Sequence, residues 1–185
     1  MTAARSALEL PRAAVGCIAV VLVILGPVAE AAESISTTIR RADCRPAPAE
    51  LQRAFAERDL GVQKCPAPGD WHLLFVASHA NSWLELRRHD FAWSGEQAIV
   101  YETPIGLFPN VGGSPRVEWR RDAHGRIHAL IFRVVAQDPA NPAKRVSRLF
   151  VVRLGPMGAC VIGRVTTNEA ARKLADSLLG CSGPR

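Results

Sequence analysis

The chain has 185 residues, of which 48% are hydrophobic and 22% charged, and this composition is typical of a globular protein and excludes an intrinsically disordered chain. Its formal net charge of +6 comes from 23 Lys and Arg against 17 Asp and Glu. Such a charge suits contact with an anionic envelope polymer, lipid headgroups or an acidic envelope protein. Nucleic acid is not an expected partner, because the sequence has no nucleic-acid-binding motif and begins with an export pattern.

The N-terminal segment has the pattern of an export signal. Residues 13–28 are uncharged, and two arginines lie among the residues before them. Small residues follow, with Ala29 and Ala31 at the spacing of a signal-peptidase site. We predict a signal peptide over residues 1–31, cleaved after Ala31 or Ala32, and therefore a periplasmic or secreted protein.

The alternatives to a cleaved signal are an uncleaved membrane anchor and lipid attachment at Cys17. An uncleaved segment would anchor the chain, and it is the only part of the chain expected to enter a membrane. Lipid attachment at Cys17 is disfavoured, because the apolar run follows this cysteine whereas a lipidation site needs it to precede. Both an anchor and a cleaved signal leave the bulk of the chain outside the cytoplasm.

Four cysteines follow the signal, and an even number in an exported chain predicts disulfides. Four cysteines allow three connectivities. We favour Cys44–Cys65 and Cys160–Cys181, because each pair brackets one predicted helix. A redox or zinc site would need closely spaced cysteines, and no C-x-x-C is present.

After the signal we expect a mobile leader over residues 32–43 and a single domain over residues 44–185. The first helix should start at Pro46, since prolines are tolerated in a first turn, and end at Gly61. Alternating or continuous apolar residues then predict strands over residues 71–77, 82–88, 91–93 and 98–102.

The second half contains the clearest hairpins. After a loop over residues 103–115, strands are predicted over residues 116–121 and 126–135 around the turn 122–125. This register places Val117 opposite Leu130 and Trp119 opposite His128. A second hairpin joins residues 145–154 to 159–165, and a last helix follows a capping box at Thr166 and Glu169.

These elements predict an α+β fold. We expect an antiparallel sheet of about six or seven strands, with two short helices, one near each end of the mature chain, packed on one of its faces.

No motif for catalysis, a cofactor or a metal stands out. The five histidines (His72, His79, His89, His124 and His128) lack helical metal-ligand spacing. A hydrolase using Ser78, His79 or Ser114 is the enzymatic alternative. The carboxylates that could pair in glycoside chemistry are expected to be solvated partners of the arginines; they are Glu85, Asp90, Glu96, Glu102 and Glu118.

Candidate binding residues lie on two predicted strands. By alternation Trp83 shares a face with Glu85 and Arg87, so it is either an exposed platform for a ligand or a tryptophan covered by a loop or helix. The arginines expected to be exposed and to contact an anionic partner are Arg87, Arg88, Arg120 and Arg121. The loop over residues 103–115 is expected to join them.

The C-terminal part has a cysteine within the strand 159–165, followed by the alanine-rich segment 168–176 and then Cys181. About 25 residues of this pattern resemble the tail of uncharacterised bacterial secreted families. The resemblance implies a periplasmic, disulfide-bonded domain and supports the pairing of Cys160 with Cys181. It implies no activity and no functional residues.

Taken together, these features predict an exported protein, without enzymatic activity, that binds or modulates a component of the cell envelope. The alternatives are a periplasmic hydrolase with an unrecognised site and an anchored accessory subunit of an envelope complex. Ligand, partner and oligomeric state are not encoded in any pattern of the sequence.

Overall fold

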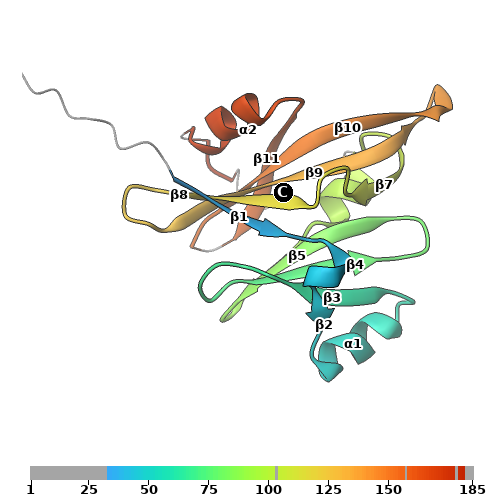
Figure 1. Ribbon diagram of the computed structural model, residues 1–185, viewed down its shortest axis with the longest axis horizontal. Helices are drawn as coiled ribbons and strands as arrows, with labels where there is room; N and C mark the ends of the chain where they lie inside the picture. The colour runs from blue at the N-terminus through green and yellow to red at the C-terminus, as the bar shows by residue number, and fades with distance from the viewer. Residues whose placement is uncertain (1–32, 103, 157, 178, 182–185) are drawn as a thin grey trace, which may run out of the picture.

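The computed structural model describes residues 33–102, 104–156, 158–177 and 179–181, and two antiparallel sheets pack against each other within them (Figure 1). The first sheet has six strands in the order β1-β8-β9-β10-β11, with β7 paired to the outer part of β9. Its strands are β1 (Glu33–Thr38), β7 (Leu107–Val111), β8 (Arg116–Arg121), β9 (Ile127–Asp138), β10 (Asn141–Leu154) and β11 (Ala159–Val165). The second sheet has five strands in chain order: β2 (Arg45–Pro46), β3 (Gly61–Cys65), β4 (His72–Ala77), β5 (Ser82–Arg88) and β6 (Phe91–Ser94).

Four short helical segments complete the described structure: η1 (Arg41–Asp43, a 3-10 turn), α1 (Ala49–Ala56), η2 (Gln97–Glu102, a π-helical segment) and α2 (Asn168–Ala175). The hydroxyl of Thr167 caps α2 by accepting a hydrogen bond from the backbone N–H of Ala170, at 3.2 Å. Helix α2 packs on β9, β10 and β11, whereas α1 packs beside β3 (Figure 1). Among these residues, no helix combines the length and apolarity needed to cross a bilayer.

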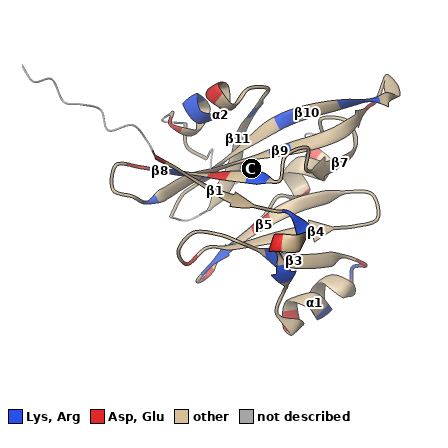
Figure 2. Cartoon of the chain, in the orientation of Figure 1, with Lys and Arg blue, Asp and Glu red and all other residues tan. Residues whose placement is uncertain are grey.

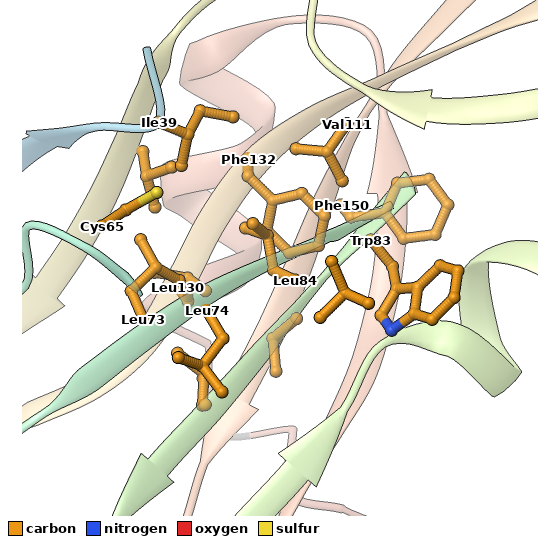
Figure 3. Close-up of a cluster of buried hydrophobic side chains, with 14 of the residues drawn as sticks. Ile39, Cys65, Leu73, Leu74, Trp83, Leu84, Val111, Leu130, Phe132 and Phe150 are labelled. Atoms are coloured by element: carbon orange, nitrogen blue, oxygen red, sulfur yellow. The ribbon is translucent and has the colours of Figure 1, made fainter. Parts of the chain in front are cut away.

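The main core fills the space between the sheets (Figure 3). Strand β9 directs Leu130, Phe132 and Val134 into it, and the Phe132 ring stacks 6.0 Å from the ring of Phe150 on β10. Ala129 and Ile131 on β9 point the other way. With Leu149 and Val151 on β10 and with Ala171 and Ala175 on α2, they form a small second core beneath α2. Strand β9 is apolar on both faces because both faces are covered, one by the second sheet and one by α2.

Both favoured disulfides are confirmed. Cys44 is bonded to Cys65, with Cα atoms 4.2 Å apart, and this bond ties the segment before α1 to the end of β3. Cys160 is bonded to Cys181, with Cα atoms 5.6 Å apart, and this bond ties β11 to the segment after α2. By the chain-entropy argument a closed loop of this length stabilises the fold by about 3 kcal/mol.

The predicted α+β class is confirmed in its coarse form, but the predicted single sheet is wrong. The described residues contain eleven strands in two sheets. The two helices also cover different sheets, instead of sharing one face. Alternation along each strand showed that one face was buried, but a second sheet can bury a face as well as a helix can.

Three segments differ from their predicted structure. Residues 98–102, predicted as a strand, lie in η2, where Ile99 is fully buried; a short apolar run fits either structure. The predicted loop 103–115 contains β7. The expected leader over residues 32–43 contains β1, which pairs with β8 along its whole length. The predicted signal peptide and its cleavage site lie outside the described residues.

The β8–β9 hairpin forms around the predicted turn, but its predicted register is wrong. Trp119 pairs with Leu130 and not with His128, because Arg121 pairs with Ile127 instead of Arg126 and the register shifts by one more residue between Arg120 and Arg121. Such a bulge turns the next side chain to the other face of the sheet. His128 therefore lies on the α2 side, where its Nε2 is 3.5 Å from an oxygen of Asp176.

Candidate ligand-binding cleft

An open cleft lies at one end of the molecule, where turns of both sheets meet, and its volume is about 830 Å³. The second sheet contributes its β3–β4 and β5–β6 turns, and the first contributes its β8–β9 and β10–β11 turns. The charged or titratable residues of its lining are Asp70, Arg88, His89, Asp90, Arg121, Asp122, Arg126 and His128. The cleft therefore brings three arginines and three aspartates together.

The wall from the second sheet is built around Trp71, whose edge packs against the ring of Phe91, with centroids 5.5 Å apart. The guanidinium of Arg88 lies over the Trp71 ring, 5.1 Å from its centroid, and its Nε is 3.2 Å from an Asp70 oxygen. Nε2 of His89 lies 2.9 Å from the same oxygen. Reduced hydration raises the pKa of Asp70, but the His89 hydrogen bond and the Arg88 charge outweigh it, so the pKa is lowered.

The wall from the first sheet is the β8–β9 turn. The carboxylate of Asp122 accepts hydrogen bonds from the backbone N–H and the Nε of Arg126, both at 2.9 Å. The backbone hydrogen bond is the main reason that the pKa of Asp122 is lowered. Next to it, the guanidinium of Arg121 pairs with Glu33 on β1. The carboxylates thus hold both guanidiniums at the rim of the cleft.

Two buried polar atoms of lining residues have no hydrogen-bond partner among the described residues: Nε of Arg121 and Nδ1 of His128. Burial, reinforced by the charge of Arg153, lowers the pKa of His128 despite the nearby Asp176. His128 is therefore mostly neutral near pH 7. A buried polar group without a partner is uncommon in folded proteins.

Of the four predicted arginines, the structure brings Arg88 and Arg121 to this cleft from opposite sheets. Alternation explains Arg88, since Leu84 and Leu86 precede it on the buried face of β5. Arg87 points to the outer face of the second sheet, where its Nη2 is 3.5 Å from an oxygen of Glu85. Arg87 does not line the cleft.

Arg120 is buried, so its predicted exposure is wrong, and Trp83 is also buried, which is the covered one of its two predicted alternatives. Trp83 shares a face with Glu85 as predicted, since its Nε1 donates to Glu85 Oε1 at 3.5 Å, but only 2% of it is exposed. It lies beside η2 in Figure 3, which is the covered alternative. Arg120 is 6% exposed, because β8 directs it beneath α2.

The residues beneath α2 form a buried ionic network. Arg120 pairs with Asp176, its Nε donating at 3.1 Å, and Nε of Arg172 donates to Glu118 at 2.7 Å. The hydroxyl of Ser34 also donates to Glu118. Partial burial raises the pKa of Glu118, but the Arg172 and Ser34 hydrogen bonds outweigh it, so the pKa is lowered. Glu118, expected to be solvated, is buried, and so is Glu85.

The residues of the hydrolase alternative lie apart from the cleft. The hydroxyl of Ser78 donates to the backbone oxygen of Asn81, and Nδ1 of His79 lies 3.4 Å from an Asp59 oxygen. Ser114 accepts a hydrogen bond from the backbone of Arg116. Within the described ranges, no serine hydroxyl is hydrogen-bonded to a histidine ring, and no three His, Cys, Asp or Glu side chains are grouped as metal ligands.

Sequence reasoning missed several cleft residues, above all Asp70 and Arg126. Both lie in turns, where the sequence shows polar residues but not which turns meet. The positive φ of His89 (48°) is one local sign of a special position, and only the backbone reveals it.

Comparisons of the chain with models of protein families, with curated proteins and with solved structures found no match.

Proposed function

We propose that this chain is an exported binding protein, without enzymatic activity, that holds a segment of an anionic envelope polymer in the cleft between its sheets. The observation that carries the proposal is the meeting of Arg88 and Arg121, from opposite sheets, in one open cleft. Two disulfides fit a protein that folds outside the cytoplasm. The predicted signal peptide is consistent with this location.

The chemistry of the lining favours an acidic saccharide as the bound segment. A guanidinium has five N–H donors, and each cleft arginine uses only some of them on its carboxylate partner. The remaining donors suit a carboxylate, sulfate or phosphate group. The carboxylates of Asp70, Asp90 and Asp122 can accept hydrogen bonds from sugar hydroxyls, which a purely cationic site would not do.

Calorimetric titration with dextran sulfate, compared with uncharged dextran, tests this proposal. Wild-type protein should bind only the sulfated polymer. The substitutions Arg88→Gln and Arg121→Gln should each weaken binding about tenfold, because each removes charged hydrogen bonds. Thermal unfolding of each variant shows whether the fold is intact.

The matched control is Arg53→Gln on α1, which makes the same change in net charge at an exposed residue outside the cleft. It should leave binding within about twofold of wild type. An equal loss in Arg53→Gln, or equal binding of uncharged dextran, would show that only overall charge or the glucose backbone matters, and the proposal would fail.

A further inference from the structure

A second surface, far from the cleft along the first sheet, exposes large apolar side chains. Leu107 and Phe108 on β7 are 44% and 53% exposed. They follow one another, on a short strand beside the outer part of β9. Adjacent exposed apolar side chains of this size favour a contact surface.

The backbone conformation of Phe108 is a second sign that its exposed side chain has a function. Its φ is 50°, in the left-handed region that glycine and asparagine adopt most readily. A bulky aromatic residue here destabilises the folded chain through its backbone conformation, and its half-exposed ring recovers only part of the stabilisation that burial would give. Combinations of this kind are concentrated at functional surfaces.

Cations lie on the hairpin next to this apolar pair. Strand β11 pairs with β10 only from Leu149 to Leu154, so the β9–β10 hairpin projects beyond it as an arm, which we define as residues 133–148 (Figure 1). The arm has four cations and one acid, a formal net charge of +3. Figure 2 shows basic residues along the outer part of β10. The cations are Arg133, Lys144, Arg145 and Arg148.

The apolar pair and the cations lie together. Gln137 on β9 pairs with Leu107 on one side and with Arg145 on the other, so one row across three strands contains all three residues. Phe108 and Arg145 also line one hollow of about 370 Å³, with His79 from the β4–β5 turn of the other sheet. This volume is in the range of sites for small ligands.

We propose that the arm and β7 dock this protein onto a membrane surface that contains anionic lipids. Leu107 and Phe108 enter the boundary between headgroups and acyl chains, and Lys144 and Arg145 bind lipid phosphates. This contact is separate from the cleft and does not depend on polymer binding there.

A bilayer fits these observations better than an acidic protein does. Apolar side chains flanked by cations are what an interfacial contact requires, and a bilayer supplies both of their partners without a matching shape. The hollow beside Arg145 has room for one headgroup, but not for a folded surface. None of the four arm cations has a carboxylate within 4.0 Å in the described part of the chain. Arg133 and Arg148 are half-buried and donate hydrogen bonds to Ser147, whereas Lys144 and Arg145 are exposed and can bind phosphate.

Vesicle flotation tests the proposal, with vesicles of phosphatidylcholine alone or mixed equally with phosphatidylglycerol. The mature wild-type chain should float with the mixed vesicles only. Lys144→Gln and Arg145→Gln should each weaken binding about fivefold. Phe108→Asn should weaken it about tenfold and keep the fold, because asparagine tolerates a positive φ.

Two controls make the result specific. Arg41→Gln with Arg53→Gln removes two charges outside the arm and should leave flotation unchanged. Binding of dextran sulfate by the arm variants should also stay at its wild-type level. Flotation that is unaffected by the arm variants, that is lost equally in the charge control, or that is absent in the wild type would overturn the proposal, whatever the cleft binds. An acidic synthetic peptide that binds Arg145 while vesicles do not would point instead to a protein partner.

Discussion

The cleft and the arm differ in how their cations are held. Each of the three cleft arginines has an acid partner: Asp70 for Arg88, Glu33 for Arg121 and Asp122 for Arg126. The arm cations that we assign to lipid contact, Lys144 and Arg145, are exposed and make no such pair with a described residue.

Paired and unpaired cations suit different kinds of ligand. A paired guanidinium keeps one orientation, so the cleft suits a ligand whose acidic groups are in fixed positions. An unpaired cation on a flexible side chain suits a surface where anions have no fixed position, and its contribution falls as salt screens it. The cleft is therefore suited to selectivity, and the arm to attachment.

The largest expected effect is on stability, and it separates the buried ionic network beneath α2 from the exposed arm. Arg120→Ala leaves the buried carboxylates of Glu118 and Asp176 with fewer partners and should lower the free energy of unfolding by about 3 kcal/mol. Arg145→Ala removes the same side-chain type from the exposed arm and should change it by less than about 0.5 kcal/mol. Urea unfolding measures both. A loss in Arg120→Ala as small as that expected for Arg145→Ala would show that the network beneath α2 adds little to stability.

Gly106→Ala should disturb the packing of β7 beside the arm without affecting the cleft. A Cβ at this position would overlap the backbone oxygen of Gln137 and lie 3.1 Å from the Ala136 Cβ, so β7 would have to move away from β9. We expect a loss of about 2 kcal/mol and weaker flotation with anionic vesicles, with polymer binding in the cleft unchanged.

Gly112→Ala is the matched control for this substitution, because a Cβ there has no neighbour within 4 Å. It should leave stability and flotation near their wild-type values. If Gly106→Ala behaves in the same way, the placement of β7 against β9 does not matter for the arm.

A smaller effect is expected at the cleft end, where His128 should make the free energy of unfolding depend on pH. The folded pKa of His128 lies below its ordinary value of 6.5, so between these two values the unfolded chain binds more protons. Stability contributed by this group therefore rises with pH through that window and is complete above about 6.5. His128→Gln should flatten the dependence, as measured by urea unfolding from about pH 5 to 8.

His124→Gln serves as the control for this measurement, because His124 is exposed in the neighbouring turn. It should keep the wild-type slope. An unchanged slope in His128→Gln would mean that another group causes the pH dependence.

The smallest expected effect is a gain in stability. Phe108→Asn replaces a bulky residue at positive φ with one that tolerates it and should raise the free energy of unfolding by about 1 kcal/mol while weakening vesicle binding. Leu107→Asn, next to it, should give no such gain. A loss of stability in Phe108→Asn would mean that the Phe108 ring contributes to packing, and its exposure would then be no sign of function.

Local patterns predicted much of this fold. Helix α2 was predicted from its buried stripe, although its N-cap is Thr167 and not the predicted Thr166, and both disulfides were predicted from the spacing of the cysteines around helices. These features depend on residues close together in the chain. The predicted single sheet was wrong, because pairing of distant strands leaves no mark in the alternation of any one strand.

The candidate site was predicted less well, and particular residues show why. Alternation correctly placed Trp83 on the face of Glu85, but the covering η2 was read as a strand. The bulge after Arg120 changed the neighbours of His128, and a one-residue shift of this kind has no local signal in the sequence.

The order of the residues alone indicated the α+β class, the favoured pairing of the cysteines and most of the strands, because each of these depends on a short-range periodicity or spacing. Only the tertiary structure decided that Arg88 and Arg121 share a cleft, that Arg120 is buried, and that Leu107 lies in one row with Arg145. These neighbours come from different strands or sheets, and their distances are set by packing of the whole chain.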